Sequence, residues 1–550
     1  MADTTGAAPK VEGVSEKRGS FEHMEAGTPP PGDNQLTWKY VKENKRVLAW
    51  CFYIFLLPVN FGYEISTLGK LMAVIPFLER FGREVDGKMV IAATDQQILN
   101  AANTIGLFVS AFITGWISDK IGRKNTIMIG CMACIGGIIW QYFSTTIMML
   151  WGGKLLATLG MGLGHSLGPV FVAELAPTKM RGICLTLVNT MIVLGQWLNA
   201  LCIMGSKSLD GDQQWRIPLI TQIISPSLLL CGYFFLPESP SWLIIKGRTE
   251  EAAKSFRRFN GPNFNVDEAV AVTKAAVEAE AEVSRSGAVT DWLQCFKGPD
   301  GRRTLIICMV YISQQTIGVN FISGYLTYYF RLAGVNDPLA IGQAAFAIQL
   351  VGNMVSWPLV DRIGRRPIIV YGCIGMTAGL LLIGGIGTLN SPSALNAIVA
   401  LMVIWGFTAS SSPFSPSTPG ISNLNQYQAT LGAVAYAIGG ETPSPVLRQK
   451  TYAINIMTAT AMSCMVLQVM PYLINTDELN LGAKICFIFF AFSVPMCVYL
   501  YFCLPEMKGR TYLELQEMFQ NRVPARKFRA YKCVGIEGTM HKEEDIKEEK

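Results

Sequence analysis

Apolar residues along the chain fall into long runs that alternate with short polar loops. A helix needs roughly 20 mostly apolar residues to cross a bilayer. Six such runs precede a polar stretch at 243–303, and they lie at 47–67, 98–117, 126–143, 148–170, 183–204 and 217–236. Six more follow, at 305–330, 340–360, 368–388, 397–440 with a polar interruption, 452–473 and 485–504. We number these runs spans 1 to 12.

The pattern predicts an all-α polytopic membrane protein with twelve transmembrane helices in two six-helix halves, residues 46–242 and 304–520. Residues 1–36 are rich in Gly, Pro, Ser and Glu, and we expect a disordered cytosolic tail over residues 1–45. Residues 521–550 form a second expected tail. The stretch 243–303 has helical patterning at 249–258 and 266–285, which predicts a helical linker between the halves.

Composition supports the membrane interpretation. Half of the residues are hydrophobic and 16% are charged, whereas soluble domains carry about 25% charged residues. The net charge is +6, and its Lys and Arg residues gather in alternate short loops. Those loops and both termini are therefore expected in the cytosol, and no nucleic-acid partner is expected. The fourteen cysteines show no metal-ligand spacing, so we expect neither a metal nor a cofactor.

Three charged motifs end corresponding spans of the two halves, in the same order. They are the pairs Asp119/Arg123 and Asp361/Arg365, the pairs Glu174/Arg181 and Glu441/Arg448, and the single acids Glu238 and Glu506. Acids and guanidinium groups at neighbouring helix ends can close one face of a bundle and release it when the halves rock apart. We expect these ten residues to form a cytoplasmic gate. The alternative is that they are loop charges that only set the topology.

From residue 45 onward the chain resembles the sugar-porter family of major facilitators, and within it the fungal maltose and hexose proton symporters. The resemblance rests on the repeated motifs, on Pro-Glu-Ser-Pro at 237–240, and on Gln314 and Gln315 with Gly318 and Asn320. Residues 441–451 and 471–475 are similar to the alpha-glucoside branch. The resemblance implies two parallel halves with the substrate held between them.

In sugar porters, cavity-facing amides and aromatic side chains hold the substrate. The chemistry fits, because an amide both donates and accepts hydrogen bonds, as a sugar hydroxyl does. The spacing of seven between Asn189 and Gln196 also places these two on one helix face. For each amide the alternative is a contact that fastens neighbouring helices. The resemblance assigns substrate binding to Asn189, Gln196, Gln314, Gln315, Asn320, Gln349 and Tyr436.

Three positions depart from the family pattern. Ala433 stands where most members have Pro, Tyr436 where they have Trp, and Ala459 where an amide is common. A roomier cavity that admits a disaccharide is one consequence. A non-sugar metabolite as substrate is another.

Two ionisable residues interrupt the apolar spans, Glu64 in span 1 and Lys154 in span 4. Ionisable residues inside a membrane are costly and usually functional. The resemblance aligns them with the acid and its cationic partner in proton-coupled sugar porters. A motion that separates the pair or exposes it to water changes the proton affinity of Glu64. That affinity would then differ between the states open to the two sides of the membrane, which would couple transport to protons. The alternative for Glu64 and Lys154 is a static ion pair that only fastens two helices together. His165, also in span 4, is either a proton relay or a packing residue.

The polar segment 409–426 interrupts span 10 with residues unsuited to a lipid-exposed helix. Its removal would join 405–408 to 427–430 as one helix of ordinary length. We expect an unremoved in-frame intron, with an extracellular loop as the alternative. Sequencing the mature transcript decides between them.

These features together predict proton-coupled uptake of a hexose or an alpha-glucoside, by one chain acting as a monomer in the plasma membrane. An uncoupled sugar facilitator, a transporter of another polar metabolite and a non-transporting nutrient receptor are the alternatives. An enzyme is not expected, because no nucleophile with a neighbouring base and no phosphate-binding loop occurs in the sequence.

Overall fold

The computed structural model describes most of the chain, namely residues 42, 44–85, 88–176, 180–261, 264–271, 273–274, 292–335, 337–389, 391–405, 427–432, 434–435, 438–439, 442–443, 447–475, 477–508, 510, 512–531 and 533. The segment 409–426 and most of the two predicted tails lie outside these residues. The expectations for them therefore stay predictions.

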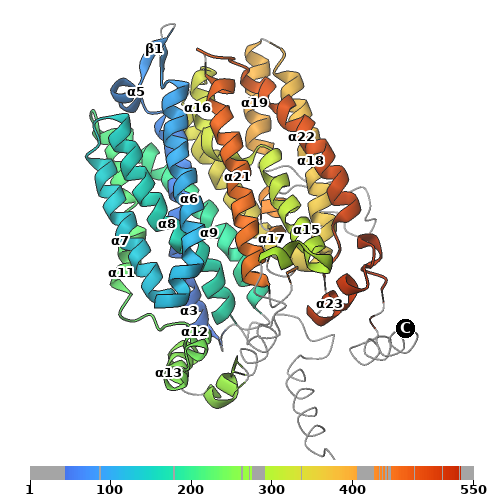
Figure 1. Ribbon diagram of the computed structural model, residues 1–550. Coiled ribbons are helices and arrows are strands. Elements are labelled where there is room, and N and C mark those ends of the chain that lie inside the picture. The colour runs from blue at the N-terminus through green and yellow to red at the C-terminus, as the bar shows by residue number, and fades with distance from the viewer. Residues whose placement is uncertain are drawn as a thin grey trace, which may run out of the picture.

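The first six spans are upright helices that form one side of the molecule (Figure 1). Span 1 consists of α3 (Lys45–Ile54) and α4 (Leu56–Leu71), and span 6 of α10 (Gln213–Thr221) and α11 (Ile224–Cys231). Between them lie α6 (Ala93–Ile121), α7 (Arg123–Tyr142), α8 (Ile147–Leu175) and α9 (Arg181–Ser206). Span 6 breaks after Thr221 because Pro226 has no N–H for the carbonyl of Gln222, and its ring crowds that carbonyl.

The other six spans form the second half. Span 7 consists of α15 (Gly298–Thr316), the π-helical turn η2 (Phe321–Tyr325) and α16 (Leu326–Leu332). Span 10 includes α19 (Pro392–Trp405) and the π-helical turn η3 (Tyr427–Gly432). The remaining spans are α17 (Pro338–Ile363), α18 (Arg365–Ile386), α21 (Arg448–Ile474) and, after the 3-10 turn η4 (Gly482–Lys484), α22 (Ile485–Cys503). In the described residues, eight helices are long and apolar enough to cross a membrane by length and composition.

Short elements mark the two ends of the bundle (Figure 1). One end, which we call the hairpin end, carries α5 (Ile75–Phe81) and the antiparallel strands β1 (Arg83–Val85) and β2 (Lys88–Val90), with Arg83 opposite Val90. The opposite end, the linker end, carries α12 (Pro240–Ile245), α13 (Thr249–Asn260), η1 (Trp292–Phe296), α23 (Tyr512–Gln520) and η5 (Ala525–Lys527). The helix predicted at 249–258 is α13.

Two details differ from the sequence-based expectation. The hairpin of β1 and β2 was not expected in an all-α chain, because a three-residue strand carries no readable hydrophobic alternation. In addition, α15 begins at Gly298, so residues 298–303 belong to span 7 and not to the linker. Its first turn is polar, with Pro299 at the helix start, and hydropathy therefore placed the boundary too late.

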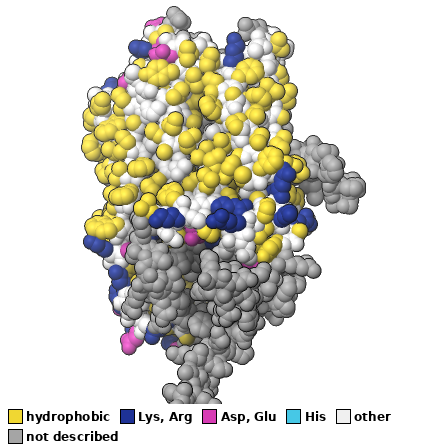
Figure 2. Space-filling model, turned by 45° about the vertical axis from the view of Figure 1, so that its right-hand side comes forward, with side chains coloured by type: hydrophobic (Ala, Val, Ile, Leu, Met, Phe, Trp, Pro, Cys, Tyr) yellow, Lys and Arg dark blue, Asp and Glu magenta, His cyan; other side chains and the backbone are white. Residues whose placement is uncertain are grey.

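The outer surface suits a bilayer. Figure 2 shows a broad belt of hydrophobic side chains, with Lys and Arg gathered at the upper end and along the lower edge of the belt. Large apolar side chains such as Phe112, Phe234 and Phe492 are more than half exposed. In water such a surface would aggregate, whereas lipid tails cover it without cost.

The two halves make close contact at the hairpin end. On α6, Gln96 Nε2 donates to Asn475 Oδ1 at 3.0 Å, and Asn100 Nδ2 donates to the Tyr325 hydroxyl at 2.6 Å. Gly69 on α4 lies against η2, where a Cβ on Gly69 would come within 1.3 Å of the carbonyl oxygen of Gly324. The structure is therefore a conformation closed at the hairpin end.

We expect Gly69→Ala to lower the rate of sugar uptake by about ten-fold or more, because overpacking costs about 1–3 kcal/mol and here opposes one conformation of the cycle. Gly324→Ala is the matched control. A Cβ on Gly324 meets no atom within 4 Å, so its uptake should stay within about two-fold of wild type. Initial uptake rates, normalised to protein at the cell surface, test this. Equal rates for the two variants would contradict it.

Candidate substrate cavity and charged sites

A cavity of about 210 Å³, which is open to solvent, lies between the two halves. Its wall is built from spans 1, 2, 4 and 5 of the first half and spans 7, 8 and 11 of the second. Of the seven residues predicted to bind substrate, six line it: Asn189, Gln196, Gln314, Gln315, Asn320 and Gln349. The tertiary structure therefore brings together side chains up to 160 positions apart in the sequence.

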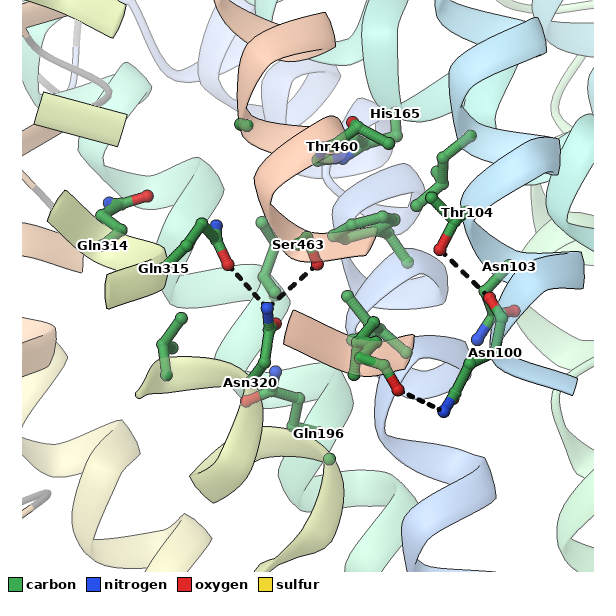
Figure 3. A pocket seen from close by; sticks show the side chains of 18 of the residues that line it. Asn100, Asn103, Thr104, His165, Gln196, Gln314, Gln315, Asn320, Thr460 and Ser463 are labelled. Carbon is green, nitrogen blue, oxygen red and sulfur yellow. Dashed lines mark hydrogen bonds between the residues drawn. The ribbon is translucent and has the colours of Figure 1, made fainter. Parts of the chain in front are cut away.

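Span 7 supplies the densest group of amides (Figure 3). Its helix α15 ends at Thr316, and Gly318 takes φ +92°, a conformation that favours glycine. This break brings Asn320 to the cavity, where its Nδ2 donates to Gln315 Oε1 at 2.7 Å and to Ser463 Oγ at 3.0 Å. Gln314 Nε2 donates to the carbonyl oxygen of Leu431 at 2.8 Å.

The first half offers unpartnered polar atoms to the cavity. Gln196 Oε1 and His165 Nδ1 are buried and have no hydrogen-bond partner among the residues that the structure describes. The His165 ring stacks on Phe61 with 3.7 Å between the ring centroids and 9° between the planes. The stacking supports the packing role for His165, which lines the cavity and keeps unused hydrogen-bonding capacity at its buried Nδ1.

The sequence did not single out the residues that span 2 contributes. Asn100, Asn103 and Thr104 line the cavity on the side opposite to Gln314 and Gln315 (Figure 3). Their spacing of three and four positions places them on one face of α6, and three polar residues at that spacing in an apolar span were a usable signal. Aromatic and hydroxyl side chains complete the wall, namely Tyr311, Tyr325, Tyr452, Thr460 and Ser463.

We expect Gln315→Ala to raise the apparent KM for the transported sugar by about ten-fold. The change removes a cavity amide and also leaves Asn320 without its acceptor at 2.7 Å, and an unsatisfied buried amide costs about 1–3 kcal/mol. Gln213→Ala, at the exposed start of α10, is the control and should leave KM unchanged. Concentration-dependent uptake by the two variants measures the effect. An unchanged KM in Gln315→Ala would mean that this amide only fastens helices.

Glu64 and Lys154 form an ion pair inside the first half. Lys154 Nζ donates to Glu64 Oε1, and Gln222 Nε2 donates to Glu64 Oε2 at 2.7 Å. The side chains of Glu64 and Lys154 are 0% and 3% exposed. Phe61 and Ile65, on the same helix as Glu64, line the cavity beside the pair. Gln222 was missed from sequence, although a glutamine between two prolines of an apolar span marks a polar helix break.

At the linker end, Arg123 lies between two acids. Its Nη1 is 3.2 Å from Asp119 Oδ1 and its Nη2 is 3.5 Å from Glu174 Oε1. Ser239 Oγ donates to the other oxygen of Glu174, and burial raises the pKa of Glu174 above its ordinary value. The described contacts therefore join spans 2, 3 and 4 to Ser239, the residue before α12, within one half.

Glu238 and Glu506 occupy corresponding places in the two halves. Glu238 Oε1 accepts from the backbone N–H of Arg123, the first residue of α7, at 2.9 Å. Glu506 Oε1 accepts from the backbone N–H of Arg365, the first residue of α18, at 3.1 Å. A carboxylate is favourable at a helix N-terminus, which carries partial positive charge. Each acid thus caps the start of the third helix of its own half.

A glycine precedes each capped helix. Gly122 has φ +95° and Gly364 has φ +106°. A Cβ would lie 2.3 Å from the Glu238 carboxylate in the first case and 2.7 Å from the Glu506 carboxylate in the second. Conformation and space both require glycine, which explains in physical terms why the motif repeats.

Five predicted residues cannot be placed as side chains. Tyr436 and Glu441 lie outside the described residues, and so do the side chains of Arg181, Asp361 and Arg448, whose backbones belong to α9, α17 and α21. The gate roles of these residues, and the substrate role of Tyr436, stay predictions.

Known proteins resemble the chain over most of its length. The general alpha-glucoside permease of Saccharomyces cerevisiae is 29% identical over 505 residues, which cover 90% of this chain and 78% of the permease. Maltose permease MAL31 of the same organism is 27% identical over 502 residues, with the same coverage of each chain.

Solved structures share the fold. The partially occluded, inward-open structure of the xylose transporter XylE from E. coli matches with a TM-score of 0.68 at 18% identity, and covers 85% of this chain and 100% of that chain. The structure of the proton:xylose symporter XylE bound to 6-bromo-6-deoxy-D-glucose matches with a TM-score of 0.67 at 19% identity, over 86% and 99% of the two chains. The predicted twelve-helix, two-half fold is confirmed.

The family model described as sugar (and other) transporter matches residues 50–519. This match spans both six-helix halves and the linker between them. The chain belongs to the sugar transporter family of the major facilitators.

Proposed function

We propose that the protein is a proton-coupled sugar symporter that works by alternating access. The observation that carries this proposal is the amide-lined cavity between the two halves, to which both halves contribute. Family membership and the similarity to alpha-glucoside and maltose permeases support a hexose or an alpha-glucoside as substrate.

The cavity chemistry suits a polyol. Gln196 Oε1 has no partner, and Gln315 and Asn320 satisfy each other in the empty cavity. Each sugar hydroxyl donates one hydrogen bond and accepts others, so it can satisfy the first atom and insert between the other two. Apolar and aromatic wall residues such as Phe61 and Tyr325 cover the C–H faces of the ring.

Glu64 is the proposed proton site. It is fully buried and bound by Lys154 and Gln222, which lie on spans 4 and 6. When the halves rock, a small shift of α4 against α8 breaks or rewets this pair and changes the proton affinity of the carboxylate. Because Phe61 and Ile65 of the same helix line the cavity, substrate binding and this shift act on one helix.

The linker end is proposed to face the cytosol. Lys and Arg of the short loops gather there, in agreement with the positive-inside rule. With that orientation the hairpin end is extracellular, and because it is closed, the structure is an inward-facing state. Both termini are then cytosolic. The whole cavity is built from one chain, which supports transport by a monomer, and the permease relatives support the plasma membrane as its location.

Uptake of radiolabelled glucose and maltose tests the proposal. The protein is expressed in yeast that lacks its own hexose transporters, and uptake is compared at external pH of about 5 and about 7.5, with and without an uncoupler. Accumulation that is stronger at pH 5 and collapses with the uncoupler supports symport. Uptake that ignores both means a facilitator. No uptake of either sugar by protein confirmed at the cell surface would overturn the choice of substrate.

A further inference from the structure

Lys70 on α4 is a second lysine buried at membrane depth, and neither the motifs nor the transport mechanism above uses it. The residue is 3% exposed. Its Nζ donates to Ser66 Oγ at 2.8 Å and to the main-chain carbonyl oxygen of Gln196 on α9, also at 2.8 Å. The ammonium group lies 4.0 Å from the ring centroid of Phe346, which belongs to α17 of the other half.

No acid balances this charge in the part of the chain that the structure describes. All contacts of Lys70 there are with a hydroxyl, a carbonyl and an aromatic ring. Glu64 is already neutralised by Lys154. A second cation lies close by on the hairpin side, since Arg331 Nη1 donates to the carbonyl oxygen of Ala73 at 2.8 Å. Uncompensated charge inside a membrane is costly and marks function.

The lysine lies just behind the cavity wall. Gly69, its chain neighbour, and Gln196, its hydrogen-bond partner, both line the cavity. On the far side Phe346 covers the ammonium group, and this contact joins the two halves. When the halves separate at the hairpin end, Phe346 moves away with its half and uncovers one side of Lys70 to the opened cavity.

We propose that Lys70 is a specificity-determining cation for a sugar that carries one carboxylate, such as a uronic or aldonic acid. The inference rests on the proposed function and extends its substrate class from neutral sugars to their carboxylate derivatives. The cavity amides take the hydroxyl groups, and Lys70 takes the carboxylate through a charge-assisted hydrogen bond.

The same geometry favours release on the other side. In the hairpin-closed state the protons of Nζ are engaged by Ser66, Gln196 and the face of Phe346. A carboxylate must then compete with these groups for the ammonium. With the hairpin end open, the carboxylate replaces the ring and binds more tightly. Lys70 therefore gives the acidic sugar a higher affinity in the hairpin-open state, which the sugar enters, than in the hairpin-closed state, from which it leaves.

Two matched pairs of probes test the proposal, D-glucose against D-glucuronate and D-galactose against D-galacturonate. Binding to the purified full-length protein is measured at pH of about 6, where the acids are ionised. For at least one pair, the wild type should prefer the acid by about ten-fold or more, because only the acid can form the charge-assisted hydrogen bond with Lys70. Lys70→Met should remove this preference and leave affinity for the neutral sugar within about two-fold.

Two further variants separate charge from folding. Lys70→Arg keeps the charge and should keep the preference for the acid. Lys207→Met, at an exposed lysine of the hairpin end that pairs with Asp337, should change neither affinity. A wild type that binds neutral sugars as well as or better than both acids overturns the inference, as does an acid preference that survives Lys70→Met. If glucose or maltose is transported under those results, the proposed function stands and only the inference about Lys70 fails.

Discussion

Glu64→Gln is expected to abolish accumulation of sugar against its gradient while sugar still equilibrates across the membrane. Glu64 is the one acid of the buried triad with Lys154 and Gln222. Glutamine has nearly the same shape. Its one oxygen can accept from Lys154, and its NH2 group can donate to Gln222 when that amide turns over, but it cannot bind and release a proton. A pH difference of two units corresponds to about 2.7 kcal/mol, or about a hundred-fold accumulation, for each coupled proton. The variant should lose this proton-driven accumulation.

The measurement is the steady-state ratio of internal to external labelled sugar at external pH of about 5. Exchange of internal for external sugar is measured in parallel and should survive, which shows that the variant is folded and moves substrate. Glu79→Gln, at an exposed acid of α5, is the control and should accumulate like wild type. Undiminished accumulation in Glu64→Gln would mean that the pair with Lys154 is static and only joins α4 to α8.

Lys154→Met is expected to destabilise the fold by about 3–5 kcal/mol, because it leaves Glu64 buried without a counter-charge. Thermal unfolding of the purified variant in detergent, compared with that of the wild type, measures the effect.

The double variant Glu64→Gln with Lys154→Met provides the matched comparison. It removes both charges, so most of the lost stability should return, while accumulation should stay absent. A double variant that is no more stable than Lys154→Met would show that Lys154 contributes through packing. Wild-type stability in Lys154→Met alone would contradict the pairing itself.

The apolar runs were sufficient to predict where the helices lie. Each predicted span contains a helix in the described residues, because about 20 consecutive apolar residues have no stable place except a bilayer and must satisfy their backbone groups internally. The predictions were less accurate where local chemistry overrides hydropathy. The polar first turn of α15 and the hairpin β1–β2 are examples, since neither changes the average apolar content of its neighbourhood.

The site was predictable in part. The amides of span 7 were found from the resemblance, and the pair Glu64 with Lys154 from its cost inside a membrane. Asn100 and Gln222 were not found, because a single amide in an apolar span looks the same whether it lines a cavity, completes an ion pair or joins two helices. Only the neighbouring helices decide which of these it does.

The sequence by itself determined the membrane environment, the number of spans and the duplication of the two halves. These properties depend on local composition and on residues a few positions apart. The tertiary structure decided the rest, namely which amides share the cavity, that the hairpin end is closed, and that Lys70 contacts both halves with no acid beside it among the described residues. Those properties depend on how helices distant in sequence pack together, and a charge acquires its functional meaning only from the groups that surround it in space.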